Sequence, residues 1–270
     1  MIKFMLITND SAVAQYAEKC GVGRIFVDLE RNGKRERQGH LDTLISQHSM
    51  DDVSKIKKSI NSAQLLVRLN PFYDGSQLEI EGAIRAGAQI LMLPMFRTIE
   101  EVERFCRMVD GRAEVVPLVE TVDAVNVLSD LVQIHGVSEI YIGLNDLHLD
   151  MGLKFMFEPL ASGLIDQMVE IIKAAGLSYG FGGIARTEEG AIPGEMVLAE
   201  HQRLGSSSVI LSRTFHRKGE SLADFSESSS LEVELRKLRD TEKRLQLRSE
   251  ADCEKDFLRL KEVVRLVVEK

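Results

Sequence analysis

The sequence predicts a (β/α)8 TIM barrel with a C-terminal helical extension. The first 215 residues alternate between short apolar runs rich in β-branched residues and segments with helical periodicity. Strands that alternate with helices pair in parallel, because the helix serves as the crossover between them. Eight apolar runs suit a closed barrel, although a doubly wound open sheet has similar spacing and stays an alternative. The runs are Ile2–Ile7, Arg24–Leu29, Leu65–Leu69, Ile90–Met95, Val115–Val119, Ile140–Leu144, Ser178–Ile184 and Ser207–Ser212.

The segments between these runs carry helix start and stop signals. "SAVAQYAEKCG" follows an Asp-Ser cap, and "SQLEIEGAIRAG" ends at Gly87. Thr98 is followed three residues later by Glu101, which is the pattern of a capping box. The segment from Pro159 to Gly176 begins with proline and ends with glycine, so we expect one helix there.

The composition changes after Phe215. "RKGESLADFSESSS" is polar, and from Leu231 to Val268 leucine and valine recur at helical spacing among charges of both signs. "RSEADCEK" is expected to interrupt this helix. We predict a barrel domain over residues 1–218, a linker over 219–230 and a helical oligomerisation arm over 231–270. A pair of solvated surface helices is the alternative.

Composition and charge exclude several classes of protein. The chain is 44% hydrophobic and 28% charged, with a formal net charge of −8, which is typical of a soluble globular protein and unsuited to general nucleic-acid binding. Its three cysteines form no CxxC pair, which fits a reducing compartment. No signal peptide or membrane-length apolar run occurs. We therefore expect a cytoplasmic protein without a nucleic-acid or membrane partner.

Two acids and an arginine end the predicted strands. Glu120 follows "VVPLV", Asp146 follows "IYIGLN", and Arg68 lies in "LLVRLNP". The carboxyl ends of barrel strands face a shared pocket, and Mg²⁺ takes one or two protein carboxylates there. A guanidinium at the end of a buried strand suits a carboxylate or enolate oxygen. Each acid alone is more often a helix cap or solvated, and Arg68 alone more often a structural ion pair. Together the three indicate a site for a 2-oxo acid and its enolate.

Other polar residues extend this candidate site. Asp28 and Glu30 alternate along the chain and therefore point the same way, either to orient metal-bound water or to pair with Arg31, Lys34 or Arg37. The "GFGG" run is a weak phosphate-loop signal without the P-loop lysine, and close backbone approach to a ligand is its other use. The candidates for substrate contact are Asn70, Asn145, Gly182 and Gly183.

The histidines divide into two groups. His40 and His148 lie nearer the predicted rim, where either side chain is a candidate for proton transfer. His48, His135 and His201 occur in helix-like or loop contexts, so we expect them to be solvated.

The motifs "VDLE", "VRLNP", "GAQILMLPMFRTIEEVERF", "PLVET" and "IGLNDLHLDMG" resemble the HpcH/HpaI aldolase/citrate lyase family, which belongs to the phosphoenolpyruvate/pyruvate-binding TIM barrels. The resemblance covers roughly residues 24–155, with weaker agreement to about 215. It implies that Glu120 and Asp146 ligate Mg²⁺, Mn²⁺ or Co²⁺, and that Arg68 binds the substrate's carboxylate or oxo oxygen. It also implies C–C bond chemistry beside a pyruvate- or acetyl-type enolate, in a homo-oligomer that exchanges C-terminal helices.

The chain also departs from this family. Its aldolases often carry a base histidine directly after the acid pair of strand two, where this chain has Arg31. The base is then metal-bound hydroxide, Glu30 or a loop histidine such as His40. Members that handle CoA esters share "DLE" and "VRxNP" better, yet no obvious basic cluster for CoA phosphates occurs near the C-terminal strands beyond Arg186 and Arg213.

The sequence therefore predicts a divalent-metal-dependent carbon–carbon lyase, a class II aldolase acting on a 2-oxo acid. A CoA-thioester lyase with the same enolate chemistry is one alternative. A barrel that has lost catalysis and serves as a scaffold or binding subunit is the other.

Overall fold

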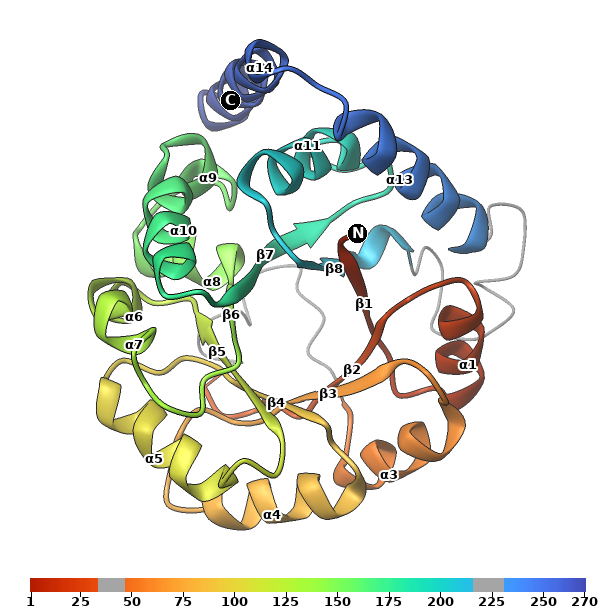
Figure 1. Ribbon diagram of the computed structural model, residues 1–270, viewed down its shortest axis with the longest axis vertical. Helices are drawn as coiled ribbons and strands as arrows, with labels where there is room; N and C mark the ends of the chain where they lie inside the picture. The colour runs from red at the N-terminus through yellow and green to blue at the C-terminus, as the bar shows by residue number, and fades with distance from the viewer. Residues whose placement is uncertain (34–46, 216–230) are drawn as a thin grey trace.

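In a computed structural model the chain folds into a closed barrel of parallel strands (Figure 1). The structure describes residues 1–33, 47–215 and 231–270. The strands pair in sequence order, and β8 returns to β1 through Lys3–Met5, which confirms the barrel and excludes the open sheet. The strands are β1 Lys3–Ile7, β2 Arg24–Asp28, β3 Gln64–Arg68, β4 Ile90–Leu93, β5 Glu114–Val119, β6 Glu139–Ile142, β7 Ser178–Ile184 and β8 Ser208–Leu211.

Helices surround the barrel, and most of their bounds follow the sequence signals. The capping box of Thr98 and Glu101 is confirmed at the start of α5. The single helix expected from Pro159 to Gly176 is wrong, because Gly163 adopts φ 86° and separates α9 from α10. The helices are α1 Ser11–Lys19, α3 Met50–Ser59, α4 Ser76–Ala86, α5 Ile99–Val109, α6 Val122–Asn126, α7 Leu128–Leu131, α8 Leu144–Asp150, α9 Glu158–Ala161, α10 Leu164–Ala174, α11 Gly194–Leu204, α13 Leu231–Leu245 and α14 Glu250–Val268, with a 3-10 turn at Arg213–Phe215.

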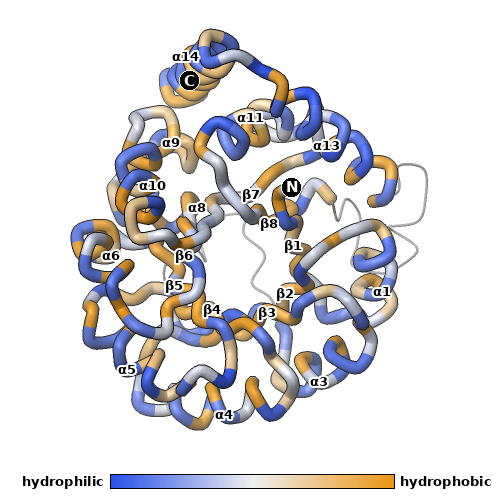
Figure 2. The backbone as a smooth tube through the Cα atoms, viewed as in Figure 1, coloured by the Kyte–Doolittle hydropathy of each residue, from blue (hydrophilic) through white to orange (hydrophobic). Residues whose placement is uncertain are grey.

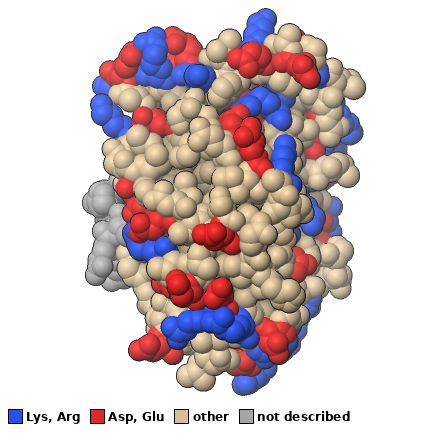
Figure 3. Space-filling model, turned by 60° about the vertical axis from the view of Figure 1, so that its left-hand side comes forward, with Lys and Arg blue, Asp and Glu red and all other residues tan. Residues whose placement is uncertain are grey.

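Apolar side chains fill two concentric layers. Along β2, Phe26 points into the barrel, whereas Ile25 and Val27 pack against the surrounding helices. This alternation is the period of a strand whose two faces are both buried. Figure 2 shows mainly apolar residues along the strands and alternating apolar and polar residues along the surrounding helices. On the face in Figure 3, positive and negative side chains lie in adjacent small groups rather than in one area of a single sign.

A buried ion pair crosses the amino-terminal end of the barrel. Arg24 of β2 donates to both carboxylate oxygens of Glu139 on β6, at 3.0 and 2.7 Å, and the side chains are only 2% and 4% exposed. Since β2 and β6 lie on opposite sides of the eight-stranded ring, this pair spans its interior. Ser208 of β8 donates to Glu139 at 2.6 Å, and Gln64 of β3 accepts from Arg24 at 3.3 Å. The charges are therefore hydrogen-bonded as burial requires.

Removal of one partner of this pair should strongly destabilise the fold. We expect Arg24→Met or Glu139→Gln each to lower the free energy of unfolding by about 3–5 kcal/mol, because the remaining group is buried without its partner. Chemical denaturation measures this loss. The double variant Arg24→Met/Glu139→Leu should lose less than the sum of the single variants. Substitution of the exposed pair Arg236–Glu232 is the control. If the losses of the Arg24 and Glu139 single variants simply added in the double variant, the ion-pair account would be contradicted.

The C-terminal helix α13 packs against the barrel of its own chain and lies between α11 and α1 (Figure 1). Arg239 of α13 donates to the Ile2 carbonyl at 2.7 Å and places its guanidinium 3.9 Å from the Phe4 ring centroid. Glu242 accepts the Ile2 N–H at 2.7 Å. Residues 231–245 thus form part of the helical layer around the strands.

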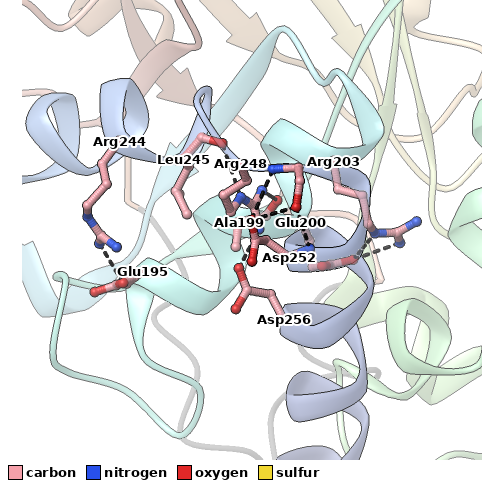
Figure 4. A network of polar contacts seen from close by, with 10 residues as sticks. Glu195, Ala199, Glu200, Arg203, Arg244, Leu245, Arg248, Asp252 and Asp256 are labelled. Atoms are coloured by element: carbon pink, nitrogen blue, oxygen red, sulfur yellow. Dashed lines mark hydrogen bonds and ion pairs between the residues drawn. The ribbon is translucent and has the colours of Figure 1, made fainter.

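The second C-terminal helix, α14, is held on α11 by Arg248, as Figure 4 shows. Arg248 donates to the Ala199 carbonyl at 2.8 Å and to Asp256 at 2.6 Å. The expected interruption occurs, but between Leu245 and Glu250, so most of "RSEADCEK" forms the first turns of α14. The predicted linker lies outside the described residues, and the oligomerisation role stays a prediction. Among the described residues, none of the helices combines the length and apolar character that a membrane span requires.

Candidate active site

Five predicted site residues converge at the carboxyl end of the barrel. Asp28 ends β2, Arg68 ends β3, Glu120 follows β5, and Asp146 lies in the first turn of α8. Glu30 follows β2, and all four acids are at most 9% exposed. The charges of Asp28, Glu30 and Glu120 act on the guanidinium of Arg68, and those of Asp146 and Glu30 act on Glu120, so these groups share one electrostatic site.

Two acids at the end of β2 bind one edge of the Arg68 guanidinium. Its Nε and Nη2 donate to the two oxygens of Asp28 at 2.9 and 2.8 Å, and Nε lies 3.3 Å from Glu30. Burial lowers the pKa of Arg68, but Asp28 and Glu30 outweigh it and raise that pKa well above its ordinary value. Arg68 thus forms the ion pair that a lone arginine at this place favours, and its predicted role in substrate binding stays a prediction. Within the described residues, Nη1 is the guanidinium nitrogen without a protein acceptor.

The carboxylate of Glu120 is fixed from two sides. Oε1 accepts the backbone N–H of Met95 at 3.1 Å. Met95 has φ 53°, a left-handed conformation that costs a residue with a side chain about 1–3 kcal/mol and persists where the surroundings impose it. On the other side lies Gly143, where a Cβ atom would stand 2.7 Å from Oε2. Glycine at position 143 therefore makes room for Glu120.

Burial, and then the charges of Asp146 and Glu30, raise the pKa of Glu120 well above its ordinary value of 4.5. Arg68 and the Met95 N–H lower this pKa, but they do not compensate. Such a carboxylate gains from a bound cation, because the cation offsets the repulsion between the two acids. Two carboxylates with water and substrate oxygens suit Mg²⁺. Within the described part of the chain, no three or more His, Cys, Asp or Glu side chains are grouped so that they could together bind a metal ion. As two buried acids whose charges repel each other, Glu120 and Asp146 fit a hard divalent cation.

A methyl group at position 143 should weaken cation binding. We expect Gly143→Ala to lower Mg²⁺ or Mn²⁺ affinity by about 10- to 100-fold, as for other changes beside metal ligands, because its Cβ displaces the Glu120 carboxylate. Titration calorimetry measures the affinity. Gly23→Ala is the matched control, since its Cβ would meet no heavy atom closer than 3.7 Å. Equal cation affinities in the wild type and Gly143→Ala would contradict the view that Gly143 makes room for the Glu120 carboxylate.

The raised pKa of Glu120 predicts the pH dependence of the cation-free protein. Above the unfolded value of 4.5, the folded state holds its proton while the unfolded state releases it, so stability falls as pH rises towards the folded pKa and then levels off. Each pKa unit corresponds to about 1.4 kcal/mol. Chemical denaturation at several pH values above 4.5 gives the free energy of unfolding of the wild type and of Glu120→Gln. The difference between the two proteins isolates the contribution of Glu120. A difference that does not change with pH would contradict it.

Asn70, whose contact with substrate stays a prediction, joins two elements. Its Oδ1 accepts the N–H groups of Arg31 and Asn32 at 2.8 and 3.0 Å, and its Nδ2 donates to Glu79 of α4 at 2.5 Å. Asn70 therefore positions the loop that follows Glu30. Asn145 is half-buried beside Asp146; it lies in helix α8 rather than at the end of a strand, because β6 ends at Ile142.

The glycines of β7 serve close packing. Gly182 has φ 54°, its carbonyl accepts the Tyr141 hydroxyl at 2.7 Å, and a Cβ there would stand 2.8 Å from Leu144. Gly183 is half-buried, and the pairing with β8 shifts register between Gly180 and Gly183. This irregularity at the end of the strand accommodates the Tyr141 ring inside the barrel and α8 above it.

The histidine predictions were partly wrong. His48 and His201 are buried, at 5% and 0% exposure, whereas His135 is exposed as expected. Burial lowers the pKa of His201 to about 3. The spacing of His201 from buried Val197 and Leu204 on α11 was the missed signal. His148 is buried on α8, and His40 lies outside the described residues.

The two arginines considered for CoA phosphates differ in their surroundings. Arg186 is 3% exposed, donates to the Thr214 carbonyl at 2.8 Å and lies over the Phe215 ring. Arg213 is exposed. Arg186 therefore has a structural role in joining the loops after β7 and β8.

A model of the HpcH/HpaI aldolase/citrate lyase family matches residues 9–175, which is more than half of the chain. Similar solved structures include a family protein from Burkholderia cenocepacia J2315, with 14% identity, TM-score 0.62 and coverage of 79% of this chain and 90% of that one. Citrate synthase SbnG shows 16% identity, TM-score 0.59 and coverage of 78% and 85%. RipC from Yersinia pestis shows 14% identity, TM-score 0.55 and coverage of 93% and 98%. Comparison with curated proteins gives no match.

Proposed function

Because the chain belongs to the HpcH/HpaI aldolase/citrate lyase family, we propose that it is a carbon–carbon lyase acting through the enolate of a 2-oxo acid. The observation that supports this most is the single guanidinium of Arg68, fixed among buried acids beside Glu120. Such an arrangement suits a substrate that is anionic and becomes more so at the reacting carbon.

We propose that Glu120 and Asp146 hold Mg²⁺, Mn²⁺ or Co²⁺. A cation bound there supplies Lewis-acid polarisation of the substrate's oxo group. The fixed Oε1 of Glu120 leaves its Oε2 as the ligand oxygen, and the Met95 N–H keeps that orientation. The strained backbone of Met95 is then explained by the carboxylate that it holds.

Arg68 binds the substrate's carboxylate or oxo oxygen through Nη1, since Asp28 occupies Nε and Nη2. One donor of this kind is worth about 3 kcal/mol of barrier when negative charge develops on the oxygen. Glu30 is the carboxylate for proton transfer in this proposal. Asp28 holds the Nε and Nη2 edge of Arg68 with both oxygens, and the Glu30 carboxylate lies 3.3 Å from the same guanidinium, so it stands beside the expected position of the substrate.

The alternatives have less support from the structure. Arg186 is engaged with Thr214 and Phe215, so it offers little to CoA phosphates. A scaffold that lacks catalysis has no use for a left-handed Met95, or for a Glu120 carboxyl whose pKa is raised by burial and by the neighbouring acids. The 2-oxo acid lyase is therefore the function that we propose.

Proton NMR of pyruvate in D₂O with Mg²⁺ tests this proposal through the loss of the methyl signal. We expect exchange in the wild type and a fall of about 100-fold or more in Glu120→Gln, Asp146→Asn and Arg68→Ala, as for loss of an oxyanion donor. Arg236→Ala, at an exposed position on α13, is the control. A wild type that neither exchanges pyruvate nor binds Mg²⁺ would refute the proposal. Binding of Mg²⁺ without exchange would point to a larger oxo acid or a thioester.

A further inference from the structure

We infer that His48 is a positioning residue of this site, which orients Arg68 through Asp28. The inference rests on the proposed function for its ligand, a 2-oxo acid. His48 acts on Arg68 through two hydrogen-bonded contacts in series. The first joins its imidazole to the backbone of Asp28, and the second joins the Asp28 carboxylate to the guanidinium of Arg68.

The first step is a hydrogen bond inside the protein. His48 Nδ1 accepts the backbone N–H of Asp28 at 3.0 Å, and the histidine is only 5% exposed. Because Nδ1 accepts, the neutral ring carries its proton on Nε2. The pairing of β1 with β2 ends with Ile7 opposite Phe26, so the imidazole supplies the acceptor that the neighbouring strand no longer provides.

The second step is the fixed position of the imidazole. His48 directly precedes Ser49, the N-cap of α3, which forms a capping box with Asp52. The His48 carbonyl accepts from Arg31 Nη2 at 2.8 Å. The backbone that follows the ring is therefore tied to α3 and to Arg31, neither of which depends on a ligand.

The third step runs from Asp28 to Arg68. The two residues stand opposite each other in the β2–β3 register, and both carboxylate oxygens of Asp28 accept from the guanidinium. If His48 lost its acceptor, the buried N–H of Asp28 would be unsatisfied at the end of the strand. Asp28 would then shift towards another acceptor, and Arg68 would lose the orientation that directs Nη1 to the substrate.

Two substitutions separate the acceptor from the volume of the ring. His48→Asn places a carbonyl oxygen near the position of Nδ1, whereas His48→Leu fills similar space without an acceptor. The probe is oxalate, a planar dianion that resembles the enolate of pyruvate, titrated in the presence of Mg²⁺. His135→Leu, at an exposed histidine, is the control.

We expect His48→Leu to bind oxalate about tenfold more weakly than the wild type, which is the loss expected for one hydrogen bond. His48→Asn keeps an acceptor, so its affinity for oxalate should stay within about threefold of the wild type. Affinity for Mg²⁺ alone should be unchanged in both, because Glu120 and Asp146 are not altered. Unchanged oxalate affinity in His48→Leu, equal weakening in both variants, or a parallel loss of Mg²⁺ affinity would overturn the inference.

A wild type that binds no oxalate would count against the proposed function and not against the link itself. The Arg68 Nε–H signal in NMR then decides the link, since this proton lies in the bond to Asp28. We expect faster exchange of that proton with water in His48→Leu and wild-type exchange in His48→Asn. Wild-type exchange in both variants would overturn the inference.

Discussion

Closure of the parallel ladder is the constraint on which the rest of the molecule depends. Once β8 pairs with β1, the sheet has no free edge, and the charged groups of the interior gather at its two ends. The amino-terminal end is occupied by Arg24 and Glu139, which bind each other across the ring. The carboxyl end is left to Arg68 and the acids around it, so structural and candidate catalytic charges are separated by the apolar interior.

The two ends solve the problem of buried charge differently. At the base, Glu139 accepts from Arg24 and Ser208, and its charge is matched. At the rim, Glu120 receives one backbone donor and the repulsion of Asp146. An acid paired with a cation, as at the amino-terminal end, stabilises the fold. An acid beside a like charge, as at the carboxyl end, destabilises it until a cation binds. This contrast distinguishes the candidate site from the equally buried cluster at the base.

Local pattern explains what the sequence could reveal. Apolar runs and caps indicated each strand of the barrel, and the place of Arg68, Glu120 and Asp146 at the ends of such runs indicated a shared rim. The partner of Arg24 was hidden, because Glu139 lies 115 positions away and both residues read as ordinary charges at the start of a strand. The pairing of Arg68 with Asp28 and the left-handed Met95 depend on tertiary contacts that no local pattern encodes.

The contact between Glu242 and Ile2 joins residues 240 positions apart. During synthesis the first strand leaves the ribosome long before α13 exists, so the amino end of β1 waits for the last part of the chain. A nascent chain that stops before residue 231 lacks Arg239 and Glu242, and it leaves Phe4 and the Ile2 backbone without these partners. Emergence of α13, after the eighth strand has closed the ring, is then the step that covers the amino end of β1.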